Sequence, residues 1–293
     1  MARDSKTEVA AVNIRIPDTH DRDYERLVRM LARLKRGVRV FSHQYLAISS
    51  FDRTTLEGVF SKYTEIDSDE DWFDLDTFET VSPEAAEQQV TIPKNLKPNH
   101  TQFYFTLHPR LHCITFESYS KSKRLSPKMV EKYLRGAFRL ERIIGEFGLV
   151  QADVIKSYDA VDSLMELPNL KELHFEIRRP NTDDLTDDLA AVIEARLNSV
   201  NGVEYQETIK AGSGASLEPD DRTRALGRVA AENGRVAAKN VENGIIRRHD
   251  TEETPLLEVE VHSNEEGGRA KSNSLMARLV RKIREVRRGN AQD

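Results

Sequence analysis

The sequence predicts an α+β fold, in which a β-rich N-terminal domain is followed by a domain of repeating helices and strands. Two patterns support this class. Residues 1–120 contain short apolar or alternating segments separated by polar turns, which is typical of strands. Residues 121–293 alternate segments of helical periodicity with strand-like segments, and then end in a small β-meander and a basic helix. A chain of 293 residues is long enough to bury two modest hydrophobic cores, one in each domain.

The N-terminal domain is predicted to begin with a strand and an amphipathic helix. The strand covers residues 8–16 and ends at a proline. The helix covers residues 20–36, because apolar side chains recur on one face of it, and Gly37 is well placed to end it. The last two strands of this domain are expected to pair with each other across His108-Pro109. The further strands are predicted at residues 38–49, 54–66, 102–107 and 110–117.

The second domain is predicted to begin with a helix whose N-terminus the sequence marks clearly. Ser126 is a natural N-cap and Pro127 occupies the first helical position, so the helix is expected to run to about residue 145. Asn201-Gly202 is a turn signal between a later helix and strand. The elements that follow the first helix are predicted as strands 149–156, 170–178 and 203–211, helices 159–166, 183–197 and 220–233, a β-meander over 234–261 and a basic helix over 273–288.

The composition limits the class of protein. A hydrophobic content of 38% with 32% charged residues is ordinary for a globular protein. No apolar run approaches the roughly 20 residues needed to cross a bilayer, and the N-terminus lacks the hydrophobic segment of a signal peptide. We therefore expect a cytoplasmic protein without a membrane partner. Cys113, the only cysteine, lies in an apolar run, which favours a buried thiol and excludes a Cys-rich zinc site.

Although the whole chain carries a net charge of −5, one segment is strongly basic. Between Lys121 and Arg142 there are eight basic residues and two acids, which gives a local charge of +6. A helix face that serves only solubility normally mixes both signs, so this purity of sign favours contact with a polyanion over a merely solvated face, and we favour the phosphate backbone of nucleic acid. The residues expected to contact phosphates are Lys121, Lys123, Arg124, Lys128, Lys132, Arg135, Arg139 and Arg142.

Two other helices carry rows of bases and form a predicted secondary surface. In the helix at residues 20–36, three acids in the first turn reduce the excess of positive charge. The C-terminal helix has a single acid among its bases, and it is suited to nucleic acid, an anionic membrane or an acidic partner; its lack of Trp and Phe makes the membrane the weakest of these. The residues of this secondary surface are Arg26, Arg29, Arg33, Arg278, Arg281 and Lys282.

An acidic insertion at residues 65–93 lies inside the N-terminal domain. It holds ten acids, and no Lys or Arg occurs between Tyr63 and Pro93. A calcium loop is not expected, because Trp72 stands where such a loop needs Gly and Phe78 stands where it needs Glu. The insertion is predicted to be a solvated loop; the alternative is an interaction segment that covers the chain's own basic helices until a competing polyanion displaces it.

The sequence contains no recognisable catalytic motif. A Gly-rich phosphate loop and a Gly-x-Ser-x-Gly nucleophile are both missing. The acid and lysine pairs that resemble a magnesium-dependent nuclease, such as Asp153 with Lys156, have the wrong spacing, and His108, His112 and Cys113 do not suit zinc. We therefore expect no catalytic residues, no metal and no cofactor, and keep a diverged metal-dependent nuclease as an alternative.

The segments at 8–16, 119–127 and 170–184 resemble a family of uncharacterised bacterial proteins of about this length. More distantly, the unit of strand, Arg-Pro and acidic helix at residues 173–189, together with the C-terminal β-rich region, resembles the group that includes the phage lambda exclusion protein RexA and the second subunit of the Kiwa antiphage system. That second resemblance implies a dimeric α+β protein that binds DNA with little sequence preference and acts in defence against phage.

Charge and resemblance together predict a nucleic-acid-binding component of a bacterial antiphage or abortive-infection system. The expected partners are the backbone of DNA or RNA, a second copy of the chain and a separately encoded effector protein. The alternative is a regulatory subunit that does not bind nucleic acid, in which the acidic insertion and the basic helices pair with each other across a homodimer.

Overall fold

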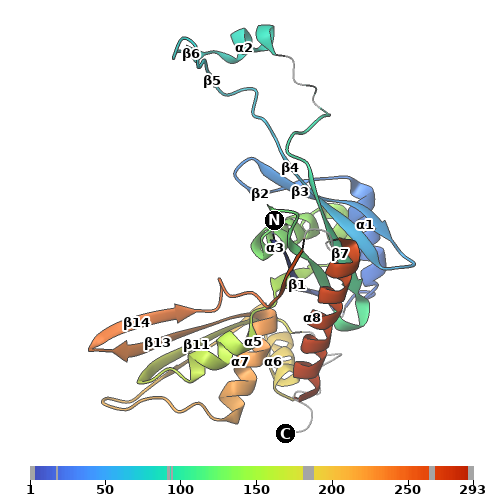
Figure 1. Ribbon diagram of the computed structural model, residues 1–293. Coiled ribbons are helices and arrows are strands. Elements are labelled where there is room, and N and C mark those ends of the chain that lie inside the picture. The colour runs from blue at the N-terminus through green and yellow to red at the C-terminus, as the bar shows by residue number, and fades with distance from the viewer. Residues whose placement is uncertain are drawn as a thin grey trace.

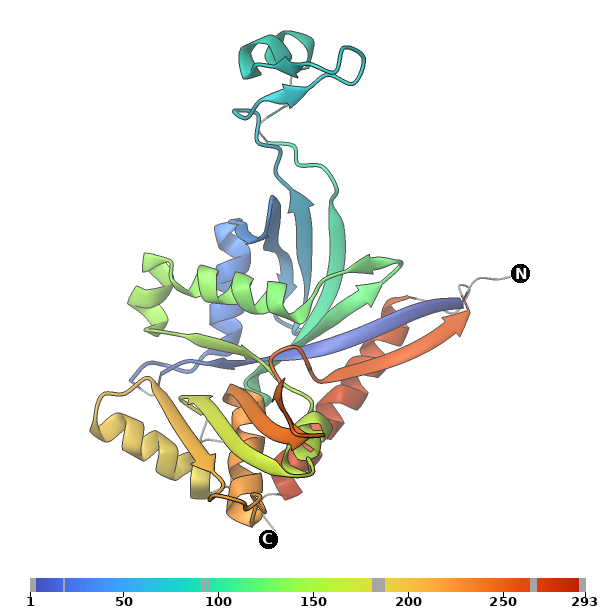
Figure 2. The same ribbon diagram turned by 90° about the vertical axis from the view of Figure 1, so that its left-hand side faces the viewer.

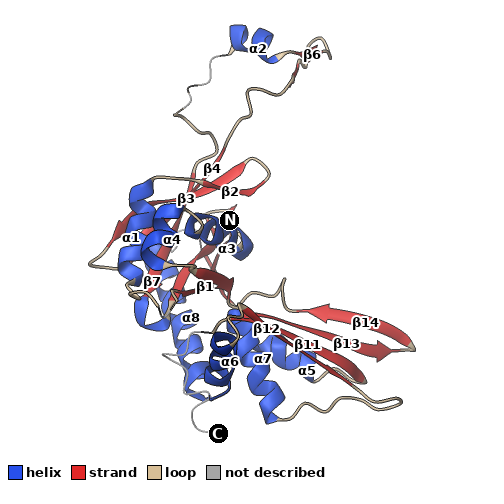
Figure 3. Ribbon diagram, turned by 180° about the vertical axis from the view of Figure 1, so that it is seen from behind, coloured by secondary structure: helices blue, strands red, loops and turns tan. Residues whose placement is uncertain are grey.

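The computed structural model confirms an α+β fold with a β-rich N-terminal part (Figure 1). It describes residues 4–17, 19–90, 93, 95–180, 188–263 and 268–289. Within these residues the chain forms a nine-stranded sheet, a four-stranded sheet and a small two-stranded sheet, in which all strand pairs are antiparallel. Helices cover both faces of the nine-stranded sheet and one face of the four-stranded sheet (Figures 1 and 3).

The nine-stranded sheet is organised around its first strand, β1 (Asp4–Arg15). On one side β1 pairs with β8 (Cys113–Ser120), and on the other it pairs first with β15 (Leu257–Ser263) and then with β10 (Gln151–Val154). Residues 9–12 of β1 are fully buried on both faces, which explains why this strand is apolar rather than alternating. The remaining strands are β7 (Thr101–His108), β4 (Glu57–Thr64), β3 (Gln44–Asp52), β2 (Val38–Phe41) and, beside β8, β9 (Lys123–Arg124).

Three helices pack on one face of this sheet: α1 (Tyr24–Leu34), α3 (Pro127–Phe138) and α4 (Glu141–Phe147). The helix predicted at residues 20–36 begins later than expected, because the Asp23 side chain accepts a hydrogen bond from the Arg26 backbone N–H and caps it there. It also ends before Gly37, at Lys35, which adopts a left-handed conformation. The helix predicted to run from Pro127 to residue 145 is divided into α3 and α4 by Leu140, whose backbone is extended.

The four-stranded sheet has the order β12 (Glu204–Lys210), β11 (Leu170–Arg178), β13 (Gly234–Glu242) and β14 (Ile245–Asp250). Helix α7 (Asp221–Asn233) runs directly into β13, and Gly234 is needed at the join because a Cβ there would lie 1.9 Å from the Glu176 carbonyl oxygen. The β-meander predicted over 234–261 begins as the β13–β14 hairpin. Its last strand, β15, crosses instead to the larger sheet and pairs with β1 (Figure 2).

A shared layer of helices joins the two sheets. Alternate β1 residues, Val9 and Ala11, enter the same core as α5 (Tyr158–Met165), α6 (Asp188–Ser199), α7 and α8 (Arg269–Gly289), which also receives Phe175 of β11. Residues 183–187 of the helix predicted at 183–197 lie outside the described residues. Segments from both sides of residue 120 contribute to the nine-stranded sheet, and the domain boundary predicted at that residue stays a prediction.

The acidic insertion forms an arm, defined here as residues 66–90, 93, 95 and 96, that stands clear of the body of the molecule in all three ribbon views (Figures 1, 2 and 3). It continues β4 and β7 outward and carries β5 (Trp72–Phe73), β6 (Thr80–Val81) and α2 (Pro83–Gln89). The insertion therefore does not cover the chain's own basic helices in this structure, contrary to the masking alternative.

A buried ion pair fixes the C-terminal helix α8 to the core. Arg287 and Glu232 are each only 5% exposed, and the Arg287 Nη2 to Glu232 Oε2 distance is 2.8 Å. Arg287 also donates to the Leu111 carbonyl oxygen, and the Tyr158 hydroxyl donates to the second oxygen of Glu232. Removing one partner of such a pair leaves the other charge buried without compensation.

We therefore expect Glu232→Ala to lower the free energy of unfolding by about 3–5 kcal/mol. The matched control is Asp159→Ala, which removes the carboxylate that pairs with Lys282. Lys282 lies on α8, as Arg287 does. The Asp159 side chain is 80% exposed, and its loss is expected to cost no more than about 1 kcal/mol. Urea unfolding of both variants measures the difference, and equal effects would show that the buried pair does not anchor α8.

A partly buried histidine, His108, makes stability depend on pH. Burial, assisted by the nearby Arg284 guanidinium, lowers the pKa of His108 to about 4, and its Nε2 lies 2.9 Å from the Thr115 hydroxyl oxygen. The unfolded chain binds this proton near its ordinary pKa of about 6.5, whereas the folded chain does not, so stability is lost as the pH falls from about 6.5 to about 4. We expect His108→Gln to flatten the stability profile in that window, and His43→Gln, at an exposed position, to leave it unchanged.

Candidate nucleic-acid interface

The predicted basic ridge, defined as Lys128, Lys132, Arg135 and Arg139, lies on the outer side of α3. Ser126 caps the helix by accepting a hydrogen bond from the Met129 backbone N–H, and Pro127 is its first residue, as predicted. The inner side is apolar and buried, and the Tyr133 hydroxyl accepts a hydrogen bond from the Ile48 backbone N–H on β3. This packing fixes the rotation of α3 and turns the ridge outward.

Two of the four ridge cations are already paired with carboxylates. Arg135 Nη2 lies 2.8 Å from Asp153 Oδ1 and 2.9 Å from Glu131 Oε1, and its Nε donates to the Ala152 carbonyl oxygen. Lys128 Nζ lies 2.8 Å from Glu252 Oε1 and 3.0 Å from Glu131 Oε2. Burial alone would lower the pKa of Lys128, but the hydrogen bonds to Glu252 and Glu131 raise it above its ordinary value. These two side chains therefore contribute less free charge than the spacing implies.

The same carboxylates connect α3 to the four-stranded sheet. Asp153, on β10, is 6% exposed and also accepts a hydrogen bond from Arg178 at the end of β11. Arg178 in turn lies 3.2 Å from Glu176, which accepts a hydrogen bond from Arg235 on β13. Burial raises the pKa of Asp153, and Arg178 and Arg135 oppose that shift. Arg135 is thus part of a network of ion pairs that runs from α3 through β10 to β11 and β13.

The other predicted cations of this surface are exposed and form no ion pair with a carboxylate among the described residues, although the charge of Lys121 acts on buried Glu117 and partly offsets the rise in its pKa that burial causes. Lys132 and Arg139 remain free on the ridge. The hairpin of β8 and β9 carries three more exposed cations, Lys121, Lys123 and Arg124. Beside them, the Lys62 side chain on β4 donates a hydrogen bond to the Arg124 carbonyl oxygen. Burial lowers the pKa of Lys62, and the positive charge of the neighbouring Lys123 lowers it further. The free cations are Lys121, Lys123, Arg124, Lys132, Arg139 and Arg142.

Helix α1 joins this surface through a cleft that the sequence did not predict. The α1–α4 cleft has a volume of about 230 Å³ and is lined by Arg29 and Arg33 of α1 and by Arg142 of α4, with Met30 and Leu34 between them. Arg26 also lines it but is paired with Glu146. Because α1 and α4 are more than a hundred residues apart in the chain, only the fold brings these guanidinium groups together.

The cations of α8 are not part of the same surface. Helix α8 packs on the face of the nine-stranded sheet opposite to α1, α3 and α4. Arg278 is paired with Glu258 and Glu260 of β15, and Lys282 with Asp159, whereas Arg281 is exposed. The predicted secondary surface is therefore split: its α1 members adjoin the ridge, and its α8 members lie beyond the sheet.

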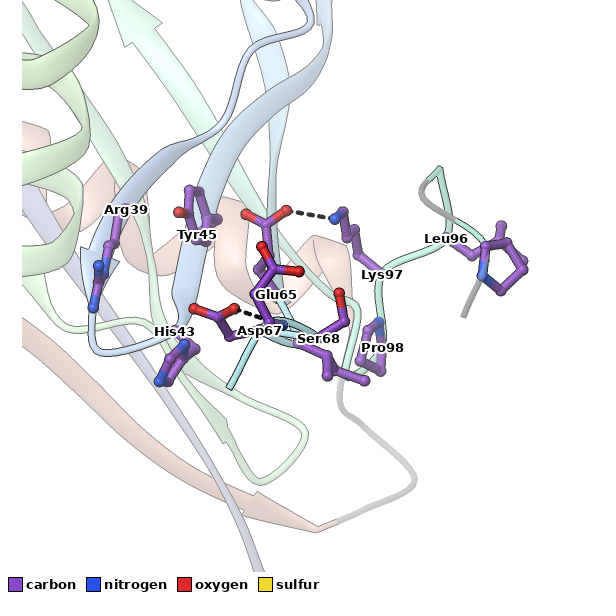
Figure 4. A pocket seen from close by; sticks show the side chains of 12 residues that line it. Arg39, His43, Tyr45, Glu65, Asp67, Ser68, Leu96, Lys97 and Pro98 are labelled. Atoms are coloured by element: carbon purple, nitrogen blue, oxygen red, sulfur yellow. Dashed lines mark hydrogen bonds and ion pairs between the residues drawn. The ribbon is translucent and has the colours of Figure 1, made fainter. Parts of the chain in front are cut away.

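A second polar cavity, of about 440 Å³, lies at the base of the arm (Figure 4). Its lining mixes both signs of charge, and Glu65 forms an ion pair with Lys97 across it. The hydrogen bond from Lys97 holds the pKa of Glu65 below its ordinary value, although burial opposes the shift. Because Asp67, Asp69 and Glu65 offset Arg39 and Lys97 here, this cavity does not favour a polyanion.

The residues considered for catalysis lie in structural positions. His108 contacts Thr115, His112 stacks on Tyr24, and Cys113 is fully buried. Asp153 and Lys156 lie near a second carboxylate, Glu131, which the sequence spacing does not indicate. Both carboxylates form ion pairs with arginines, Glu131 with Arg135 and Asp153 with Arg135 and Arg178. Within the described part of the chain, His, Cys, Asp and Glu side chains do not form a group of three that could hold a metal ion.

Of the described helices, none combines the length and apolar character that crossing a membrane requires.

The two kinds of ridge cation are expected to respond differently to removal. Arg135→Met leaves buried Asp153 with one guanidinium fewer and should lower the free energy of unfolding by about 1–3 kcal/mol. Lys132→Met, one turn away and unpaired, should change it by less than about 0.5 kcal/mol. Denaturant titration of both variants tests this assignment, and an equal cost for the two would contradict the structural role of Arg135.

A family model described as a domain of unknown function (DUF4747) matches residues 5–280. No curated protein matches the chain. The matched region includes β1, the arm, the ridge, the α1–α4 cleft and most of α8, so the elements that build the candidate interface lie within it. The chain belongs to the DUF4747 family.

Proposed function

We propose that this protein binds nucleic acid in the bacterial cytoplasm, through contacts between its basic surface and backbone phosphates. The observation that carries the proposal is the convergence of unpaired cations from three helices. Arg29 and Arg33 of α1 meet Arg142 of α4 in one cleft, and Arg139 and Lys132 continue the surface along α3. A chain with a net charge of −5 that keeps these cations free of carboxylates has a local surface suited to an anionic polymer.

The size and composition of the surface favour phosphate contacts over base recognition. Helix α3 has 12 residues and is therefore about 18 Å long, which corresponds to about five base pairs of rise along a duplex. Its free cations are Lys and Arg, which neutralise phosphates and fix register but do not by themselves read sequence. Binding with little sequence preference follows from such contacts.

We further propose that this binding serves defence against phage, together with a separately encoded effector protein. This part rests on the resemblance of residues 173–189 and of the C-terminal β-rich region to the group that includes RexA. The arginine of the Arg-Pro step in that segment, Arg179, donates two hydrogen bonds to the Gly202 carbonyl oxygen, and the preceding Arg178 binds Asp153. The segment thus has a structural role in joining the two sheets, and the cations proposed to contact phosphates lie elsewhere.

The test reverses three free cations that have no structural partner: Lys132→Glu, Arg139→Glu and Arg142→Glu in one variant. We expect wild-type protein to retard duplex DNA, single-stranded DNA or RNA in a gel shift at about 0.1 M salt, with affinity that falls as salt rises. The variant should lose retardation, because three side chains that attract phosphates then repel them. Any binding that remains should depend less on salt, since each lost phosphate contact lowers the steepness of log affinity against log salt by about one unit.

The matched control carries the same change of charge on other surfaces, as Arg196→Glu, Arg222→Glu and Arg248→Glu, all at exposed positions. It should bind as wild type does. Equal binding by the two triple variants would rule out this surface, and a wild-type protein that retards none of the three nucleic acids would overturn the proposal. Comparing the three probes shows whether DNA or RNA is preferred.

A further inference from the structure

The acidic arm exposes apolar side chains that its own molecule does not cover. Phe73 is 58% exposed, and Leu75 and Phe78 are each 74% exposed. The Phe73 and Phe78 rings contact each other edge to face, with centroids 5.7 Å apart, but the rest of both rings faces solvent. Exposed aromatic clusters of this kind are typical of surfaces that bind another macromolecule.

The arm also carries unbalanced negative charge. Its described residues include nine acids and no Lys or Arg. Glu65, just outside the arm, is paired with Lys97, but none of the nine acids has a cationic partner among the described residues. A binding site for the arm must therefore combine cations with an apolar floor.

The base of the arm holds it away from its own body. The Glu65 backbone N–H donates to the His43 carbonyl oxygen, and the Thr64 backbone N–H donates to the Pro98 carbonyl oxygen. The Tyr45 and Tyr63 rings stack beside these bonds, with centroids 5.8 Å apart, and Figure 4 shows Glu65 and Lys97 linking the two segments that lead from β4 and β7 into the arm. These contacts extend the ladder of β3, β4 and β7 and direct the arm outward (Figure 2).

The α1–α4 cleft has the complementary character. Its lining includes Arg29, Arg33 and Arg142 and the aliphatic side chains of Met30 and Leu34, and its one acid, Glu146, is paired with Arg26, so the cleft offers an excess of cations beside apolar groups. Its volume of about 230 Å³ exceeds that of a cavity of about 150 Å³ that accepts benzene. An aromatic ring flanked by carboxylates fits this surface in both charge and size.

We infer that the protein forms a homodimer in which the acidic arm of each copy docks in the α1–α4 cleft of the other. Phe73 and Phe78 supply the apolar contact with Met30 and Leu34, and arm carboxylates pair with the three arginines. A twofold axis makes the two arm–cleft contacts equivalent and closes the assembly at two copies. This inference does not depend on nucleic-acid binding.

The decisive experiment exchanges the charges of the two surfaces. The cleft variant carries Arg29→Glu, Arg33→Glu and Arg142→Glu, and the arm variant carries Asp71→Lys, Asp76→Lys and Glu79→Lys, at exposed arm positions. Each variant alone has like charges on arm and cleft, so each is expected to sediment as a monomer. Mixed together, they should form a heterodimer, because both arm–cleft contacts are then complementary.

Two results of this experiment would overturn the inference: a wild-type protein that is monomeric at every concentration, or variants that dimerise alone as well as wild type does. An arm that docks on its own molecule would leave the wild-type protein monomeric, which is the first of these results.

A second measurement uses the only tryptophan of the chain, Trp72, which lies on the arm. Its emission should move to shorter wavelength as the wild-type protein is concentrated, and return as salt is added. Phe73→Ser with Phe78→Ser should weaken dimerisation more than about tenfold and abolish the shift. Val200→Ser with Val203→Ser, which alters two valines of similar exposure on another surface, should leave both unchanged. Dimerisation of the Phe73 and Phe78 variant at wild-type strength would contradict the docking mode.

The same Phe variant separates this inference from the proposed function. It retains every cation of the basic surface and frees Arg29, Arg33 and Arg142 from the arm carboxylates, so when it no longer dimerises it should retard nucleic acid at least as strongly as wild type does. Loss of dimerisation with retained nucleic-acid binding supports both statements, and each can fail without the other.

Discussion

The buried carboxylate of Asp153 determines both how the two sheets are held together and which cations of α3 are available to a ligand. It lies at the edge strand β10, where Arg135 from α3 and Arg178 from β11 both bind its Oδ1. Without Asp153 these two guanidinium groups would repel each other across the junction. With it, α3 has a fixed position relative to the four-stranded sheet, and the free cations Lys132 and Arg139 keep a defined place on its outer side.

Local signals in the sequence predicted many of the elements. Strand β11 has the predicted bounds, α7 begins one residue after its predicted start, and the cap of α3 is formed by the residues that marked it. Each of these depends on neighbours within one turn or on simple alternation. The pairing of β15 with β1 depends on partners some 250 residues apart, and no local pattern distinguishes that strand from the third strand of a meander.

The candidate site shows the same division between local and distant information. Helical spacing predicted one row from Lys128 to Arg142, but the helix is divided at Leu140: Lys128, Lys132 and Arg135 lie on α3, Arg139 is its C-cap and Arg142 lies on α4. It did not show that two of them are neutralised, since Asp153 and Glu252 come from other segments. It likewise missed the approach of α1 to α4. The sequence shows how many cations a helix carries, but only the folded structure shows which of them form ion pairs with distant carboxylates.

The central position of β1 has a consequence for biosynthesis. Strand β1 leaves the ribosome before its partners at residues 113–120, 151–154 and 257–263, so part of its edges stays open until the last of these has been translated. Sheets that depend on such distant pairing fold slowly and expose aggregation-prone edges in the meantime. A chain that ends before β15 would leave residues 4–10 of β1 without their β15 partner, and an unpaired strand edge of this kind favours aggregation.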